Sequence, residues 1–326
     1  MIDVDRIEIY KDFELIDLSS TYDRLQWTRS FTRAGSFRME MPFTVEALGI
    51  FAEGNIIYKR DVDEAAFIER RFVVHTMEQK LILIAEGRHL SCLLDWRIFS
   101  LTEENIQLRA VFDHIINTGF TVAAGSRRSL APQFRFMPYE IPDILVSVNH
   151  RAANSATVIF NLCEERNIGV KIRYNRKEKT FDLHFSTPTE TNVVFSKEFL
   201  NVLEQDYIDD VERYRNVVYV GESFIHGDNV FTGWDRREIS IGELREGQTA
   251  TQAAQNILRQ NSKVKRLSST VDPLHQQFPY LKAWTLGSIV TSHSRELGIN
   301  QREVVTEIQE IYDREGKSVI VNMNNI

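Results

Sequence analysis

Cysteine is nearly absent from this sequence of 326 residues, which contains only Cys92 and Cys163. The two are far apart and neither belongs to a C-x-x-C pair, so their spacing predicts no zinc site and no dithiol motif. We interpret both as small buried hydrophobic side chains, with a disulfide or a metal site as the minor alternative. This usage is typical of a protein made in a reducing cytosol.

Long apolar runs are also lacking. The longest strongly apolar run, Leu81–Ala85, is far shorter than the roughly 20 residues that a membrane helix needs. The N-terminus has neither a basic segment nor a long apolar one, so we expect no signal peptide. The sequence therefore predicts no membrane helix.

There is no excess of positive charge. The chain has 39 Lys and Arg against 46 Asp and Glu, and its formal net charge is −7. A nucleic-acid-binding protein usually has a basic face, because neutralising phosphates supplies most of its affinity. We therefore expect no sequence-specific nucleic-acid binding. An acidic surface is still compatible with a nucleic acid that slides past it, because the surface repels phosphate.

The common signatures of enzymes are missing as well. There is no G-x-G-x-x-G, no Walker loop, no G-x-S-x-G and no H-E-x-x-H. Asp61–Glu64 resembles the start of a calcium-binding loop, but Ala66 stands where the loop needs glycine and Phe72 where it needs glutamate. We interpret this segment as a solvated loop.

A cluster of carboxylates is the next candidate for chemistry. Asp209, Asp210 and Glu212 are of the type that glycosidases use as acid and base or nucleophile. Arg213 and Arg215 follow closely enough to neutralise them. We interpret the cluster as a solvated or ion-paired strand end.

Histidine and tryptophan are scattered. The eight His residues, among them His226 and His275, lack the spacing of metal ligands. Trp234 could stack on a sugar or a base, but packing with its neighbours Arg236 and Arg237 is the preferred interpretation. We therefore assign no catalytic, cofactor-binding or metal-binding residue, and we expect no cofactor and no enzymatic activity.

The sequence does contain a series of short strand patterns. Apolar and polar residues alternate in Leu25–Ser30 and Phe37–Met41, which predicts a hairpin whose turn uses a positive φ at Gly35. Phe67–His75 and Leu81–Glu86 predict a second hairpin. With 43% hydrophobic and 10% aromatic residues, the chain has enough apolar material for about two or three domains.

The middle of the chain predicts a small α+β unit. The apolar spacing of residues 108–116 is that of an amphipathic helix. A second helix begins at the N-cap Asn154 and ends at Gly169. Val170–Tyr174 and Phe181–Phe185 then alternate as the two strands of a hairpin.

Between the two helices lies the polar, proline-rich segment 121–153. It predicts a long loop with one or two short extended pieces. We expect residues 121–142 to be ordered by a neighbouring subunit, because they are too polar to fold alone.

The last third returns to strand patterns. Expected strands lie near residues 193–195, 203–208, 216–220 and 239–241, and residues 250–258 predict a helix. Three strands end the chain: Trp284–Ser292, Val304–Tyr312 and Val319–Met323. The turn between the last two covers residues 313–316 and includes Gly316.

Five local motifs in this order resemble the Gp37-like family of siphophage tail proteins. They are Trp27–Phe31 leading into Ala34–Met39, then Gly54–Ile57, Arg213–Val220, Gly233–Glu238, and Leu286–Thr291 followed by Val305–Ile308 and the Gly316 turn. Together they span nearly the whole chain. Ser288 departs from the pattern, which has an Asp after the Leu-Gly pair, and this departure concerns one loop.

The resemblance implies a mainly β fold with an α+β insert: two tail-tube-like antiparallel β-barrels plus a small helix-and-hairpin domain. It places the first barrel in residues 1–100 and the α+β domain in residues 101–200. The second barrel occupies residues 201–326, is discontinuous and has a helical insert near residues 248–262.

The resemblance also implies a role as a structural hub protein of a phage or phage-like tail tip or baseplate, located in the virion tail and assembled in the cytoplasm of the bacterial host. As a homotrimer, the protein would join the hexameric tail tube or distal tail protein ring to a spike or fibre. Its ring would line a channel for DNA or the tape measure protein.

Two other functions remain as alternatives. A receptor- or carbohydrate-binding tail module would use an exposed aromatic residue such as Trp96 or Trp234. A cell-wall hydrolase would use Asp209, Asp210 or Glu212.

Overall fold

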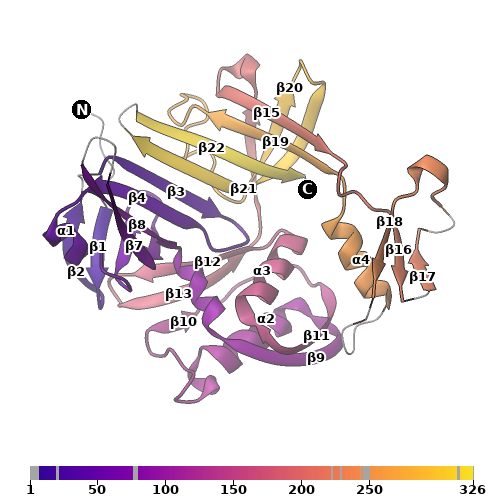
Figure 1. The fold of residues 1–326 in the computed structure, drawn as a ribbon, viewed down its shortest axis with the longest axis horizontal. Coiled ribbons are helices and arrows are strands. Elements are labelled where there is room, and N and C mark those ends of the chain that lie inside the picture. Colours follow the sequence, from indigo (N-terminus) through magenta and orange to yellow (C-terminus); the bar gives the residue numbers. More distant parts are fainter. Residues whose placement is uncertain are drawn as a thin grey trace.

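The computed structural model describes residues 7–19, 22–75, 80–221, 223–227, 230–242, 244, 250–313 and 316–325. The fold is mainly β, as the sequence predicts, with helices gathered in the middle of the chain and in one peripheral lobe (Figure 1). In the described residues, the strands form a ten-stranded sheet and four smaller sheets.

The large sheet contains a path of eight strands from both ends of the chain. In spatial order they are β15 (Val202–Asp210), β19 (Val264–Val271), β22 (Gly316–Asn325), β21 (Ile299–Asp313), β3 (Arg24–Ser30), β4 (Ser36–Pro42), β8 (Leu81–Arg88) and β7 (Arg70–His75). Every neighbouring pair on this path is antiparallel. The two N-terminal hairpins expected from the alternation are confirmed as β3–β4 and β7–β8.

Strand β21 joins the two ends of the chain. Its first part pairs with β20 (Ser288–Ser294), and its last part, Glu307–Tyr312, pairs with β3. β14 (Thr189–Phe195) adds to the outer side of β20. The yellow strands β21 and β22 and the indigo strands β3 and β4 of Figure 1 therefore belong to one continuous sheet.

A second, four-stranded sheet packs under the N-terminal half of the path. Its order is β2 (Glu14–Ser19), β1 (Ile7–Lys11), β5 (Ile56–Lys59) and β6 (Glu64–Phe67). Alternating side chains such as Ile9 and Ile57 meet Trp27 and Met39 from the large sheet in one core, which the short helix α1 (Val45–Ile50) covers.

The middle of the chain forms the predicted α+β unit. It contains η1 (Leu90–Trp96), β9 (Ile98–Gln107), α2 (Leu108–Gly119), η2 (Val122–Ala124), β10 (Phe134–Phe136), β11 (Leu145–Asn154), α3 (Ser155–Arg166), β12 (Gly169–Asn175) and β13 (Thr180–Ser186). The Asn154 side chain accepts the Thr157 N–H, which confirms the expected N-cap. Phe112 of α2 stacks on Phe185 of β13 with 4.4 Å between the ring centroids.

The C-terminal third contains the strands around β19–β22 and a peripheral lobe. The lobe contains β16 (Val217–Val220), β17 (Ser223–His226), η4 (Gly233–Asp235), β18 (Glu238–Ile241) and α4 (Ala250–Gln260), whereas η3 (Lys197–Phe199) lies between β14 and β15. In Figure 1 the lobe stands out to one side, beyond the ends of β15 and β19.

The expectation of two antiparallel barrels is wrong because the sheets do not close into barrels and because some of the strand pairs are parallel. The sheets are open: β14 and β15 do not pair, because η3 and the left-handed residue Leu200 turn the chain so that β15 joins β19 instead. The two N-terminal sheets are linked by the isolated bridge between Ala66 and His89 and otherwise pack face to face. Three strand pairs are parallel, β10–β13, β14–β20 and β16–β18, because a long connection lies between their partners.

The expectation of a long loop with short extended pieces at residues 121–153 is confirmed for residues 125–144, which contain only the short strand β10, and is wrong for the end of the segment. β11 is a ten-residue strand that pairs with β9, and the rings of Phe134 and Tyr139 are buried in the core of the middle unit. This chain's own core therefore anchors the segment at these two rings, and ordering of residues 121–142 by a neighbouring subunit stays a prediction.

Two predictions about turns fail and one is confirmed. Gly35 does not have a positive φ; it is required because a Cβ there would lie 2.2 Å from the Thr28 carbonyl oxygen. Trp284–Gly287 forms a turn rather than the start of a strand, since Gly287 has φ 81° and β20 begins at Ser288. Gly316 has φ 129°, as expected, whereas residues 314 and 315 of that turn lie outside the described part.

Candidate assembly surfaces

A group of buried charges lies where the N-terminal sheets, the middle unit and the C-terminal sheet meet. We call it the junction cluster: Arg29 on β3, Lys59 on β5, Glu64 on β6, Lys171 on β12 and Glu310 on β21. Each residue comes from a different strand, and four of the five are buried. The cluster therefore connects elements that are far apart in the sequence.

Arg29 and Glu64 form a two-pronged ion pair. The Nε and Nη2 atoms of Arg29 each donate to one Glu64 oxygen over 2.9 Å. Lys171 reaches the same carboxylate from the middle unit with 3.2 Å between Nζ and Oε1. Burial on its own would raise the pKa of Glu64, but the charges of Arg29 and Lys171 outweigh it and hold that pKa well below its usual range.

Lys59 and Glu310 form the second pair, and both side chains are 0% exposed. Their Nζ and Oε2 atoms are 2.8 Å apart, and the hydroxyls of Tyr280 and Tyr312 each donate to a Glu310 oxygen over 2.6 Å. Burial would raise the pKa of Glu310, but the charges of Lys59 and Lys317 lower it to about 2. Lys59 also binds Asp61.

The interpretation of Asp61–Glu64 as a solvated loop is confirmed for Asp61 and Asp63, which lie in an exposed turn, and is wrong for Glu64. Asp61 is held by Lys59, and Glu64 starts strand β6 and is buried. Because both carboxylates are already neutralised by protein cations, the segment is a structural connection and offers no cation site.

His89 completes the junction. Its ring lies 4.6 Å from that of Trp27, and its Nδ1 is 3.8 Å from a Glu64 oxygen. Burial lowers the pKa of His89 to about 4, even though the nearby carboxylate acts in the other direction. A cavity of about 370 Å³ lies beside it, with Arg33 and Arg173 at its wall. The packing keeps His89 neutral at physiological pH.

The large sheet has one polar face. We call it the open face. Residues that stand opposite each other on neighbouring strands lie on the same face, so Gln26 and Thr28 of β3 share the open face with Arg38 and Ser36 of β4 and with Gln309 of β21. The opposite face holds the buried side chains of the cores. A shallow depression of about 370 Å³ lies on the open face over β3, β4 and the β7–β8 hairpin.

The two outermost strands of the eight-stranded path differ in charge. β15 has Glu204, Asp206, Asp209 and Asp210 and no basic residue, and we call it the acidic edge. β7 begins with Arg70 and Arg71 and has no acidic residue, and we call it the basic edge. Both edges also expose apolar side chains, among them Val73, Leu203 and Ile208.

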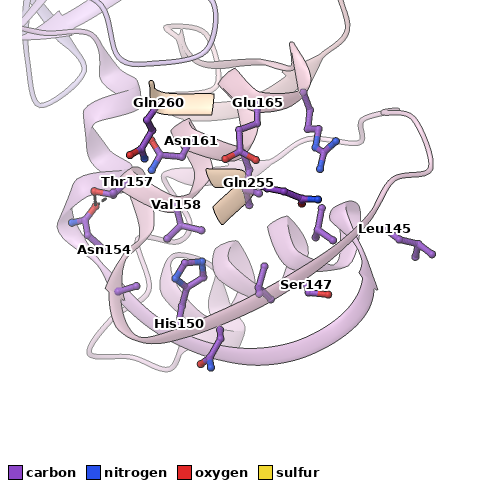
Figure 2. A pocket seen from close by; sticks show the side chains of 16 residues that line it. Leu145, Ser147, His150, Asn154, Thr157, Val158, Asn161, Glu165, Gln255 and Gln260 are labelled. Carbon is purple, nitrogen blue, oxygen red and sulfur yellow. Dashed lines mark hydrogen bonds between the residues drawn. The ribbon is translucent and has the colours of Figure 1, made fainter. Parts of the chain in front are cut away.

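A third surface feature is a cleft of about 470 Å³ between β11, α3 and α4 (Figure 2). Neutral polar side chains dominate its wall, including Asn161, Gln255 and Gln260. The dashed bond in Figure 2 joins Asn154 to Thr157 and belongs to the start of α3. Glu165 is the one carboxylate among the described residues that line the cleft, so the cleft lacks the carboxylate pair of a glycosidase.

The structure places the sequence-derived candidates apart from one another. Asp209 and Asp210 are exposed at the end of β15, as the strand-end interpretation predicts, and Asp210 accepts the Glu212 N–H. Trp234 is 100% exposed at the tip of the peripheral lobe, so the expectation that it packs with arginines is wrong. Trp96 is half exposed, with its ring 5.7 Å from that of Phe67.

Both cysteines are free and buried, which confirms their interpretation as hydrophobic side chains. Burial raises the pKa of the Cys92 thiol to about 12. In the described part of the chain, His, Cys, Asp and Glu side chains do not form a group of three that could hold a metal ion. The described helices are all too short or too polar to span a membrane.

Sequence reasoning missed the junction cluster, although a signal for it exists. Arg29 lies on the same face of its strand as the core residues Leu25 and Trp27. Glu310 likewise shares a strand face with Ile308 and Tyr312. A charged residue at a core-facing position of a strand predicts a buried ion pair, but the pattern does not identify its partner.

The sequence profile of the family described as "Siphovirus ReqiPepy6 Gp37-like protein" matches residues 6–323. No curated protein sequence matches the chain.

Several solved structures have a similar fold. The 43 kDa tail protein of prophage MuSo2 from Shewanella oneidensis is 12% identical with a TM-score of 0.64, and the match covers 98% of both chains. A tail protein from Neisseria meningitidis MC58 is 12% identical with a TM-score of 0.59, over 98% of this chain and 95% of that one. Prophage tail protein gp18 from Listeria monocytogenes EGD-e is 14% identical with a TM-score of 0.58, with the same coverage. At this identity the likeness shows the fold alone.

Proposed function

The chain belongs to the family of Siphovirus ReqiPepy6 Gp37-like proteins, and on this basis we propose that it is a structural hub protein of a phage or phage-like tail tip or baseplate. In this role it acts without enzymatic activity and resides in the virion tail, after assembly in the cytoplasm of the bacterial host.

The observation that carries the proposal is the composition of the eight-stranded path. The C-terminal part of the chain supplies β15-β19-β22-β21, and the N-terminal part supplies β3-β4-β8-β7. Each chain thus contributes two four-stranded halves side by side. Three copies in a ring would present six halves to a six-fold partner and three equivalent chains to a three-fold partner.

The presence of two four-stranded halves in each chain, and so of six in a trimer, supports a homotrimeric adaptor between the hexameric tail tube or distal tail protein ring and a spike or fibre. The polar open face of the sheet suits the wall of a channel through which DNA or the tape measure protein passes. The junction cluster suits such a part because it fixes the angle between the two halves. We propose domain limits of 1–100 and 201–326 for the two halves and 101–200 for the middle unit.

The fold of the similar structures agrees with this role. The MuSo2, Neisseria and Listeria proteins are tail proteins by name, and each of them is covered almost completely by the match. The proposal transfers that role to this chain through the shared family and fold.

Native mass spectrometry of the purified chain at about tens of micromolar tests the adaptor role, since this concentration favours weak assembly by mass action. A trimer is the expected result. A monomer that also fails to enter tail particles would overturn the proposal.

The peripheral lobe favours a second candidate, a receptor- or carbohydrate-binding tail module. Trp234 is fully exposed there, and Val230 beside it is largely exposed. Exposed tryptophan rings stack on sugars and anchor protein interfaces. Binding to a glycan array that is lost in Trp234→Ala would support this candidate, and no binding to glycans or to whole host cells would count against it.

A further inference from the structure

The eight-stranded path ends on two strands with open backbone edges. Among the strands that the structure describes, β15 pairs with β19 alone and β7 pairs with β8 alone. Unpaired N–H and C=O groups along an exposed edge are a template for pairing with another chain, and natural proteins either protect such edges or use them.

The direction of the strands allows the sheet to continue from one copy to the next. All seven neighbouring pairs on the path are antiparallel. Because the number of strands is even, β7 and β15 run in opposite directions. A rotation that relates copies around an axis along the sheet keeps these directions, so β7 of one copy meets β15 of the next as an antiparallel pair.

The two edges also match face by face. On β7, Arg70 stands opposite Glu86, which belongs to the open face through its partner Arg38. On β15, Glu204 and Asp206 stand opposite Thr270 and Ser268 of β19. These two residues in turn stand opposite Ile320 and Asn322 of β22, which lie on the open face. A continued sheet would therefore place the arginine and the two carboxylates on the same side.

The opposite face carries the apolar side chains of both edges. Val73 stands opposite the buried Leu83 and is 38% exposed only because no strand lies beyond it. Tyr207 lies on the face opposite to that of Asp206 and is 38% exposed, and Leu203, at the bulge between Val202 and Glu204, is 63% exposed. Pairing of the edges would cover these side chains and extend the hydrophobic cores across the boundary.

The charges of the two edges indicate that the partner that pairs with them is a second copy of this chain. Arg70 is 71% exposed and its contact with Glu86 is long, at 3.9 Å, so its charge remains available. In the register of β15 and β19, Asp209 stands opposite Lys265, whereas Glu204 and Asp206 stand opposite residues without charge. The basic edge and these two carboxylates are complementary, and like edges would repel.

We propose that copies of this chain join by antiparallel pairing of the basic edge β7 with the acidic edge β15 of the next copy, with Arg70 facing Glu204 and Asp206. The inference rests on the proposed function, because a ring of copies requires such a contact. It repeats between chains the antiparallel joint that β21 and β3 make within one chain.

Charge reversal tests the pairing. Arg70→Glu alone, or Glu204→Lys with Asp206→Lys, should lower the trimer fraction in native mass spectrometry by about tenfold, because each places like charges across the boundary. The triple variant restores opposite charges and should recover the trimer. Arg127→Glu, at an exposed position in the middle unit, changes the net charge by the same two units as Arg70→Glu and is its matched control.

Cross-linking gives a second readout. Because Cys92 and Cys163 are buried, new cysteines are the reactive ones. Val73→Cys combined with Leu203→Cys, the positions that face each other when Arg70 faces Asp206, should give a covalent ladder up to the trimer with a short bismaleimide. Either cysteine alone should give none, since each edge would face the other edge and not itself.

The outcomes separate the two proposals. A wild-type trimer that ignores the charge reversals and does not cross-link would overturn the edge pairing and leave the hub function in place. A wild-type chain that neither forms a trimer nor enters tail particles would overturn both. Loss of the trimer in Arg70→Glu, recovery in the triple variant and cross-linking only in the double-cysteine variant would establish the pairing.

Discussion

Lys59 shows how a single buried charge connects distant parts of this fold. Its ammonium group has no exposure and is held by Glu310 and Asp61, while the Tyr312 ring lies 5.0 Å away. A buried ion pair adds little net stability compared with an apolar replacement, but loss of one partner leaves the other charge buried and unpaired. We therefore assign to Lys59 a role in fixing the N-terminal sheets against β21.

Lys59→Met should lower the free energy of unfolding by about 3–5 kcal/mol, because Glu310 would lose its closest cation. Lys317→Met is the control: Lys317 is 3.8 Å from the same carboxylate and partly exposed, so its loss should cost about 0–1 kcal/mol. Urea denaturation of both variants measures the difference. Equal effects would show that Lys59 is not the main counterion of Glu310.

Acidification should weaken the protein in two ranges. Burial lowers the pKa of His89 from 6.5 in the unfolded chain to about 4 in the folded one. Between these two pH values the unfolded chain binds more protons than the folded chain, so the free energy of unfolding decreases as the pH is lowered. The depressed pKa of Glu310, about 2 against 4.5, adds a loss that begins below about pH 5 and continues toward 2.

Urea midpoints at pH 7, 5.5 and 4 measure this dependence. The expected result is a decrease at each step, and His89→Gln should flatten the first part of the curve. Stability that stays constant from pH 7 to pH 4 would contradict the assigned environments of His89 and the junction cluster.

At the residue scale, the sequence predicts burial better than it predicts partners. The burial of Cys92 and Cys163 follows from their apolar surroundings. The pairing of Arg29 with Glu64 does not, because the two residues lie on strands that meet only in the folded chain. The sequence predicts that Trp234 packs against Arg236 and Arg237, but in the described part of the chain its side chain is fully exposed.

At the scale of elements, regular patterns give correct assignments. The spacing of residues 108–116 and the alternation of Val170–Tyr174 and Phe181–Phe185 correspond to α2, β12 and β13. Strand β11 could not be found in the same way. Its pairing with β9 shifts register between Val146 and Val148 and again between His150 and Ala153, and these bulges interrupt the alternation on which the prediction depends.

The C-terminal hairpin provides a test at this scale. Gly316 has φ 129°, a conformation that a β-branched residue adopts only with strain, although a Cβ there would meet no neighbour within 4 Å. Gly316→Val should therefore lower the free energy of unfolding by about 1–3 kcal/mol through backbone strain alone. Gly49→Ala, at a site with space and no positive φ, is the control and should cost nothing measurable. A melting temperature unchanged in Gly316→Val would contradict the described hairpin.

At the scale of the whole molecule, the strand content follows from sequence, but the closure of the sheets does not. Closure depends on whether distant edges such as β14 and β15 meet, and their side-chain alternation is the same in an open sheet and in a barrel. The continuity of β21 with β3 is likewise invisible in the sequence, since it joins residues near the two ends of the chain. This long-range joint is the feature that makes the two halves one unit.

We propose that three copies of this chain form the hub of a tail. Cryo-electron microscopy of purified tail particles from the bacterium that encodes the chain tests it most directly. We expect three copies in a closed ring at the distal end of the tube, with the open face of the eight-stranded sheet turned toward the channel. Particles that lack the chain, or that carry it in another copy number away from the channel, would show that the chain is not a tail hub.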